Sequence, residues 1–177
     1  MDQSAKYLAL LVKWQRTQRL IGSSDPDWIV DHILLDSLLF TRVVPETTRS
    51  ILDVGSGAGV PGVPLRIVLR QPTVTLLEAR AKRVSFLSAV VRELELAKCE
   101  VVHGRLETLT AESGPRYDAV VMRCAGDPSA FYSAAVTLLT PGGLIAASGP
   151  PRRRPISRGE WREVDGPLGR RLFWVAQ

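Results

Sequence analysis

The sequence predicts an α/β fold in which helices cover both faces of a mainly parallel sheet. The first observation is that short apolar runs alternate with longer amphipathic segments, and the second is that a glycine-rich loop follows the first run. Each run is too short for a helix and is bounded by Gly, Pro or charged residues. The seven expected strands are residues 50–54, 73–78, 99–103, 117–123, 144–148, 161–164 and 171–176.

Helical patterns lie between the strands and also precede the first one. The first helix is amphipathic from Tyr7 to Trp14 and has a basic outer surface. Asp25 and Pro26 predict the start of the second helix, because they form a capping carboxylate followed by proline at the first helical position. We therefore expect an N-terminal helical extension over residues 1–45 and a core over 46–177, together forming one domain. The helices expected within the core are residues 64–70, 82–96 and 128–139.

The last two strands indicate a hairpin. Asp165, Gly166, Pro167 and Gly169 supply the turn residues between them. The predicted sheet therefore finishes in antiparallel order. A chain of 177 residues is long enough for one such domain and too short for two enzymatic domains.

Composition excludes several classes of protein. The apolar fraction of 45% and charged fraction of 23% are ordinary for a globular protein, so a disordered or fibrous chain is excluded. Cys99 and Cys124 form no CxxC pair and have no metal-site spacing to the two histidines, so no metal is expected. The apolar run at Tyr7 ends at Lys13, and no run approaches the roughly 20 residues of a membrane span. We expect a cytoplasmic protein without a signal peptide or membrane segment.

The loop after the first strand is the strongest functional signal. It reads Asp53, Val54, Gly55, Ser56, Gly57, Ala58, Gly59, and its three alternate glycines let the backbone turn sharply beside a ligand. The spacing GxGxG differs from the GxGxxG that aims a helix at a pyrophosphate. S-adenosylmethionine carries no phosphate and is cationic at sulfur, so an acid two positions before the loop suits it. We predict S-adenosylmethionine as the cofactor.

Two later segments agree with this cofactor. Glu78 ends the second strand and Ala79 follows it, where Rossmann geometry places an acid that accepts hydrogen bonds from ribose hydroxyls. The segment from Gly104 to Glu107 follows the third strand, where we expect Leu106 and Glu107 to lie against the adenine. The alternative for the glycine loop and Glu78 is a tight structural turn and a solvated acid. The alternative for the segment from Gly104 to Glu107 is a plain helix start.

Residues 53–67, DVGSGAGVPGVPLRI, resemble the signature of the bacterial 16S ribosomal RNA guanine-N7 methyltransferases, the glucose-inhibited division protein B family. Similar stretches occur in the same order over about residues 8–148. They are residues 11–14, residues 32–38 beside the family's H-x-x-D-S-L, residues 76–87 with Lys82-Arg83 and Phe86-Leu87, residues 105–107 beside its R-x-E, and residues 123–125 beside its S-R-A.

The resemblance implies a Rossmann-like class I S-adenosylmethionine-dependent methyltransferase, with a mainly parallel seven-stranded sheet, an antiparallel C-terminal strand and preceding N-terminal helices. It places Arg123 at the mouth where the target guanine arrives, as the candidate catalytic residue. Alternatively, Arg123 is a strand-end arginine paired with a local acid. The full set of expected cofactor-binding residues is Asp53, Gly55, Ser56, Gly57, Gly59, Glu78, Ala79, Leu106, Glu107 and Arg123.

Departures from the family pattern fall on the substrate side. Trp14 is followed by Gln15 instead of asparagine, and Arg19-Leu20 stands where the family has Asn-Leu. His32 and Asp36 are four residues apart instead of three. The segment 148–154, SGPPRRR, replaces a lysine and glycine, and the tail after it is short. A divergent paralogue with another substrate therefore remains an alternative.

Methylation of guanine N7 needs no general base, because that nitrogen carries a lone pair and no proton at neutral pH. Positioning and desolvation would supply the rate, and the sequence shows no nucleophile–base pair and no Asn-Pro-Pro-Tyr motif. The product guanine is cationic, so the basic residues are expected to hold phosphates instead of the base. The candidate RNA contacts are Arg16, Arg19, Arg152, Arg153, Arg154 and Arg158, although a charge run is often a solvated loop.

The net charge of +5 and the pI near 9.7 favour a polyanionic partner such as RNA. We expect a monomer that acts on ribosomal RNA or the small ribosomal subunit. Two alternatives are a methyltransferase of a small molecule or protein on the same fold, and a catalytically idle RNA-binding homologue.

Overall fold

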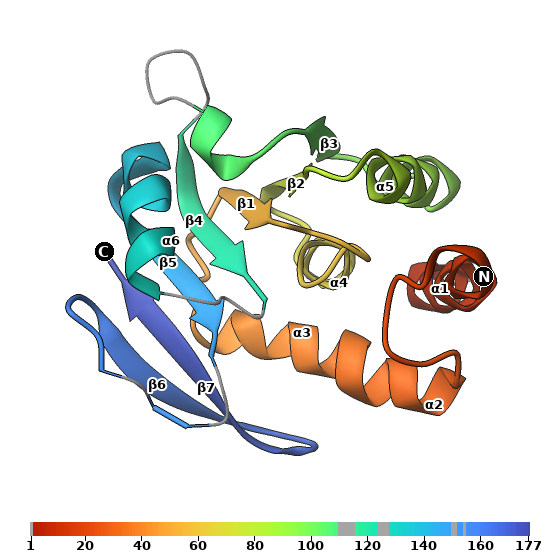
Figure 1. The fold of residues 1–177 in the computed structure, drawn as a ribbon, viewed down its shortest axis with the longest axis horizontal. Helices are drawn as coiled ribbons and strands as arrows, with labels where there is room; N and C mark the ends of the chain where they lie inside the picture. Colours follow the sequence, from red (N-terminus) through yellow and green to blue (C-terminus); the bar gives the residue numbers. More distant parts are fainter. Residues whose placement is uncertain (1, 110–115, 124–127, 150–151, 154) are drawn as a thin grey trace.

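The computed structural model describes residues 2–109, 116–123, 128–149, 152–153 and 155–177, and these form a seven-stranded sheet between two layers of helices (Figure 1). The strand order is β3-β2-β1-β4-β5-β7-β6. The first five strands run parallel to one another, whereas β7 runs antiparallel to both β5 and β6. This confirms the predicted fold class. The strands are β1 Ser50–Val54, β2 Thr73–Glu78, β3 Cys99–His103, β4 Tyr117–Met122, β5 Leu139–Ser148, β6 Glu160–Gly166 and β7 Gly169–Ala176.

Helices cover both faces of the sheet. In Figure 1, α6 lies on one side of the strands, while α1, α4, α5 and the helix that runs from α2 into α3 lie on the other. The helical segments are α1 Gln3–Gln18, α2 Pro26–Ile29, π-helix η1 Val30–Leu35, α3 Asp36–Leu38, η2 Leu39–Arg42, α4 Gly62–Val68, α5 Ala81–Glu93, η3 Leu106–Thr108, α6 Pro128–Ala135 and η4 Val136–Leu138.

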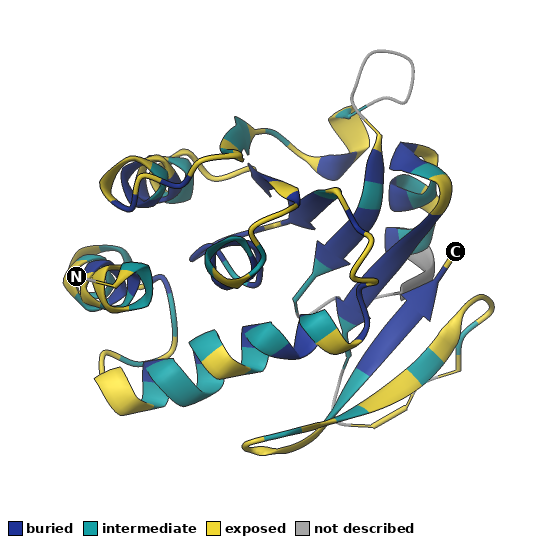
Figure 2. Ribbon diagram, turned by 180° about the vertical axis from the view of Figure 1, so that it is seen from behind, coloured by how far each residue is buried: buried dark blue, intermediate teal, exposed yellow. Residues whose placement is uncertain are grey.

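The core has two halves because successive strand residues point to opposite faces. On β1, Ile51 packs with the α1 and α5 side chains, and its neighbour Leu52 packs with the α6 side. Burial on both faces explains why the central strands read as continuous apolar runs. Figure 2 shows the central strands buried, whereas β6 at the edge of the sheet alternates exposed and half-buried residues.

The N-terminal extension is packed into the core on the glycine-loop side. Tyr7 of α1 is fully buried, and its hydroxyl donates a hydrogen bond of 2.5 Å to the carbonyl of Ala58 in the glycine loop. Asp25 caps α2, as predicted, by accepting from the backbone N–H of Asp27 at 3.1 Å. The first helix therefore contacts the loop that the sequence identified.

Some boundaries differ from the expectation. Strand β5 begins at Leu139 instead of residue 144, since Leu139 pairs with Tyr117 before the register shifts near Gly142 and Gly143. The hairpin strands are also longer than predicted, because pairing continues to Gly166 and Gly169. Cys99 lies in β3 as a free thiol, while Cys124 lies outside the described residues. Within the described ranges, no helix combines the length and apolar character that crossing a lipid bilayer requires.

The π-helix explains one departure from the family pattern. His32 and Asp36 are one residue further apart than in the family's H-x-x-D, and both lie in or next to the π-helical segment Val30–Leu35. A π-turn closes i→i+5 and so accommodates one residue more than an α-turn. The extra residue is therefore absorbed in the wide turn, and the residues after it keep the face that they would have without it.

Deleting one of the adjacent leucines, Leu34 or Leu35, gives the same shortened sequence and should convert the π-turn into an α-turn. We expect the melting temperature to move by only a few degrees, since Leu35 is exposed and a surface change costs within about 0.5 kcal/mol. The matched control is deletion of Ser85, which is exposed on the regular helix α5. That deletion rotates Phe86 and Leu87 by about 100° away from the core and should lower the melting temperature strongly. Equal losses for both deletions would contradict this account.

Candidate cofactor and substrate site

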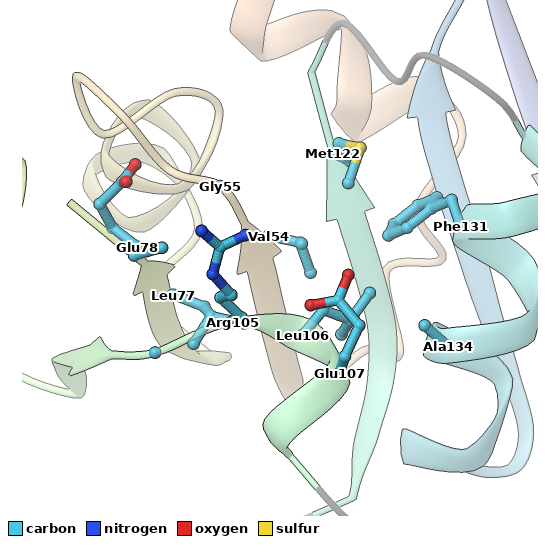
Figure 3. A pocket seen from close by; sticks show the side chains of 12 residues that line it. Val54, Gly55, Leu77, Glu78, Arg105, Leu106, Glu107, Met122, Phe131 and Ala134 are labelled. Atoms are coloured by element: carbon cyan, nitrogen blue, oxygen red, sulfur yellow. The ribbon is translucent and has the colours of Figure 1, made fainter.

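A cavity of about 340 Å³ lies at the carboxyl ends of the parallel strands, where ligands bind in open α/β sheets. Its walls come from the ends of β1, β2 and β4, the loop after β3, and α6 (Figure 3). In that view the Arg105 side chain lies between the carboxylates of Glu78 and Glu107. The lining residues are Val54, Gly55, Leu77, Glu78, Ala79, Gly104, Arg105, Leu106, Glu107, Met122, Phe131 and Ala134.

Five of the predicted cofactor-binding residues line this cavity, from three separate segments. The structure brings together Gly55, Glu78, Ala79, Leu106 and Glu107. Leu106 is buried and Glu107 exposed, and they open the 3-10 turn η3 after β3. The expected loop and the alternative helix start are thus the same segment.

Glu78 connects the cavity to the glycine loop. Its Oε2 accepts a hydrogen bond from the backbone N–H of Gly57 at 2.9 Å, and its Oε1 accepts one from the N–H of Arg80 at 2.8 Å. Arg83 Nη1 lies 3.9 Å from Oε2. The residue is 4% exposed, so it is a buried, hydrogen-bonded carboxylate. The structure therefore argues against the alternative of a solvated acid at the end of β2.

The three glycines of the loop have different structural roles, although all have positive φ. A Cβ added to Gly55 would meet nothing within 4 Å, so this position leaves the backbone open beside the cavity. A Cβ on Gly57 would lie 3.3 Å from Arg83 Nη1. A Cβ on Gly59 would lie 2.7 Å from Val63 Cγ2 and 3.1 Å from the Tyr7 hydroxyl. Gly55 thus faces the cavity, and Gly59 allows the loop to pack closely against Val63 and Tyr7.

Asp53 and Ser56 lie beneath the loop and do not line the cavity. Val54 points to the cavity, so its neighbour Asp53 points to the opposite face, where Oδ2 accepts from the N–H of Gly62 at 2.9 Å. The Ser56 hydroxyl donates to the Asp53 carbonyl at 2.9 Å. Both side chains are fully buried, and burial raises the pKa of Asp53 to about 7. These two residues support the loop from below.

The raised pKa of Asp53 predicts a pH-dependent stability. Between its ordinary pKa and about 7, the folded protein holds a proton that the unfolded chain has released. The free energy of unfolding should therefore fall as the pH rises from about 4 to about 7, by up to about 4 kcal/mol, and stay low above it. Denaturant titrations of the wild type and of Asp53→Asn measure this. The difference between the two proteins should shrink towards low pH, and a constant difference would contradict the prediction.

Arg123 follows β4 and turns towards the N-terminal extension. Its Nη2 lies 3.1 Å from Asp36 Oδ2 and also donates to the carbonyl of His32. Arg123 is thus paired with an acid, as the alternative proposed, but that acid is distant in sequence. Its neighbour Met122 lines the cavity, whereas Arg123 does not.

The candidate RNA-binding arginines form two separate groups. Arg16 and Arg19 are exposed at the end of α1, while Arg152, Arg153 and Arg158 are exposed between β5 and β6. These segments lie towards opposite ends of the long axis of the molecule (Figures 1 and 2). Arg153 pairs with Glu163 at 2.9 Å, and the Arg158 guanidinium lies 5.4 Å from the Tyr132 ring centroid. Arg154 lies outside the described residues.

Sequence reasoning missed the apolar lining of the cavity. Met122, Phe131 and Ala134 come from the end of β4 and from α6. Met122 had a usable signal, because it lies one residue before the end of a predicted parallel strand. The α6 residues had none, because their contact depends on how that helix packs on the sheet. Among the described residues, no group of three or more His, Cys, Asp or Glu side chains is arranged to hold a metal ion.

Comparison with solved structures and curated sequences agrees with this geometry. A methyltransferase from Aquifex aeolicus, described as S-adenosylmethionine-dependent, superposes with a TM-score of 0.63 at 16% identity, over 86% of this chain and 94% of that one. A ribosomal RNA small subunit methyltransferase G from Stutzerimonas stutzeri is 42% identical over 72% of this chain. The enzyme of the same name from Neisseria meningitidis serogroup B is 39% identical over 82% of this chain and 69% of its own length.

The chain spans only part of such relatives, and the match to the Stutzerimonas protein covers 58% of that protein. The model of the GidB family, described as rRNA small subunit methyltransferase G, matches residues 1–149. With the strand order, the glycine loop and the acid at the end of β2 in place, this match shows that the chain belongs to the rRNA small subunit methyltransferase G family.

Proposed function

We propose that the protein transfers a methyl group from S-adenosylmethionine to N7 of a guanine in 16S ribosomal RNA. The observation that carries the proposal is the cavity at the carboxyl ends of β1, β2 and β4, in which the open backbone of Gly55 faces the same space as Glu78. Membership of the family supports the ribosomal substrate.

The cavity suits the cofactor in size and chemistry. Its volume of about 340 Å³ falls within the range of small-molecule sites. Glu78 would accept hydrogen bonds from the ribose hydroxyls, and the apolar side chains of Leu77 and Leu106 would hold the adenine. The Cβ-free side of Gly55 leaves room for close approach of the backbone. When bound, S-adenosylmethionine supplies a methyl group attached to a positively charged sulfur.

The residues of the chain would act by binding and alignment. The N7 lone pair of guanine attacks without prior loss of a proton, so no side chain has to serve as a base. The apolar wall of Met122 and Phe131 would exclude water beside the reacting atoms. Positive charge moves onto the base in the product, so Arg123 paired with the Asp36 carboxylate opposes the reaction less than an unpaired cation would.

The proposed RNA partner accounts for the charge distribution. The sequence after residue 150 holds seven arginines and three carboxylates, which is most of the net charge of +5. Such arginines would contact phosphates and orient the RNA without reading its sequence. We infer that the protein works as a monomer in the cytoplasm, where the small ribosomal subunit is found.

One assay tests the proposal. The protein is incubated with labelled S-adenosylmethionine and with small ribosomal subunits, or their RNA, from cells that lack the modification. 7-Methylguanine is then located by reduction and strand cleavage. Label at one guanine is the expected result. Label only on small molecules or proteins would overturn the substrate, and RNA binding without label would indicate a catalytically idle homologue.

A further inference from the structure

A single carboxylate, Asp36, joins three distant parts of the chain. Its Oδ2 lies 3.1 Å from Arg123 Nη2 at the end of β4, and its Oδ1 accepts from Arg171 Nε of β7 at 2.5 Å. The Asp36 side chain is 11% exposed. Each carboxylate oxygen therefore has its own arginine partner, in a place where little water competes.

The second partner of Arg123 comes from the same helix. The nitrogen that pairs with Asp36 also donates to the carbonyl of His32 in the π-helical segment. The other terminal nitrogen, Nη1, is buried and has no hydrogen-bond partner among the described residues. A guanidinium has five N–H donors in a fixed plane, so fixing Nη2 also sets the direction of the remaining donors.

The direction of the Arg123 guanidinium is important because of where Arg123 lies. It directly follows Met122, which lines the cavity at the carboxyl end of β4. Without Asp36, the guanidinium would keep one backbone carbonyl as its acceptor and could turn about it. A buried cation would also be left without its counter-ion.

We propose that Asp36 is a positioning residue for the methyl transfer: it holds the Arg123 guanidinium at the carboxyl end of β4, next to Met122 of the cavity wall, and Arg171 in turn holds Asp36. The inference rests on the proposed function. Arg171 lies beyond residue 149, where the family match ends, so the terminal hairpin supports a site that the matched region forms.

The test measures methyl transfer to small ribosomal subunits by Asp36→Asn, Asp36→Glu and Arg171→Gln. We expect kcat to fall about 10- to 100-fold in Asp36→Asn, with the dissociation constant for S-adenosylhomocysteine unchanged within about twofold. In Arg171→Gln the pair between Asp36 and Arg123 remains, so kcat should fall less. Asp36→Glu keeps the charge and should recover part of the loss. The matched control is Asp165→Asn, which removes an exposed partner of Arg170 and should leave kcat unchanged.

A second readout does not depend on activity. Phenylglyoxal modifies accessible arginines, and mass spectrometry of peptides measures the rate at Arg123. Arg123 should react slowly in the wild type, where its side chain is 17% exposed, and faster in Asp36→Asn. If Asp36→Asn fails to fold, Arg171→Gln is measured instead: an Asp36 side chain that has lost Arg171 should hold Arg123 less firmly, so Arg123 should react faster than in the wild type.

The outcomes are distinguishable. If the wild type labels RNA and the folded Asp36→Asn labels it equally fast, Asp36 only links the N-terminal extension to the hairpin. The positioning role is then wrong, while the proposed function stands. Unchanged phenylglyoxal reactivity would likewise overturn it. A wild type that transfers no methyl group overturns the proposed function, and the positioning role with it.

Discussion

Replacing Glu78 with glutamine is expected to weaken binding of S-adenosylhomocysteine about 10- to 100-fold. The carboxylate accepts from two backbone N–H groups, of Gly57 and Arg80, and an amide has only one acceptor oxygen. Its NH₂ group would face a backbone donor or stand where a ribose hydroxyl needs an acceptor, and a ribose hydrogen bond to the charged group that is lost weakens binding by about 1.5–3 kcal/mol. Isothermal titration calorimetry of the folded variant measures the change.

The control for this substitution is Glu100→Gln. Glu100 is an exposed carboxylate that accepts from the Thr75 hydroxyl at 2.8 Å, and it does not line the cavity. Its replacement should leave the dissociation constant unchanged. If Glu78→Gln bound the ligand as tightly as the wild type, Glu78 would be only a support for the glycine loop, and the proposed ribose contact would be wrong.

Alanine at Gly59 is expected to destabilise the fold, whereas alanine at Gly55 should mainly reduce cofactor binding. The Gly59 Cβ would lie 2.7 Å from Val63 Cγ2, on a backbone with φ of +90°. Left-handed backbone costs about 1–2 kcal/mol and overpacking about 1–3 kcal/mol, so the loss at Gly59 should be about 2–5 kcal/mol. At Gly55 only the backbone cost applies, while the new methyl group enters the space beside the cavity.

Gly142→Ala separates these two effects. Gly142 also has positive φ and open space around an added Cβ, but it lies in β5 away from the cavity. Denaturant titration should give similar losses for Gly55→Ala and Gly142→Ala, and calorimetry should show weaker binding only for Gly55→Ala. Normal binding by Gly55→Ala would place the ligand away from the loop.

The sequence was sufficient for the sheet and for the location of the candidate site, because both follow from local patterns. Each buried strand is an apolar run bounded by Gly, Pro or charge, and the glycine loop and Glu78 sit at strand ends. The direction of Asp53 was also accessible in principle. Counting alternate residues from Val54 sends Asp53 to the face opposite the cavity.

The features of the candidate site that could not be predicted from the sequence depend on contacts between distant segments. Nothing local to Arg123 indicates that its partner is Asp36, since the pair forms only after the extension packs against β4. Likewise the roles of Gly55 and Gly59 look identical in the loop sequence and differ only in what lies beside each Cβ. The extra residue before Asp36 was visible, but the π-turn that absorbs it is a property of the folded helix.

The two backbone hydrogen bonds that Glu78 accepts affect how a nucleoside would bind. An ionised carboxyl group offers about four lone-pair directions, and the backbone already occupies two of them. The remaining directions are immobilised before any sugar arrives, so capture would require little further ordering of this side chain. Such an acceptor favours tight association through a small entropic penalty instead of through additional contacts.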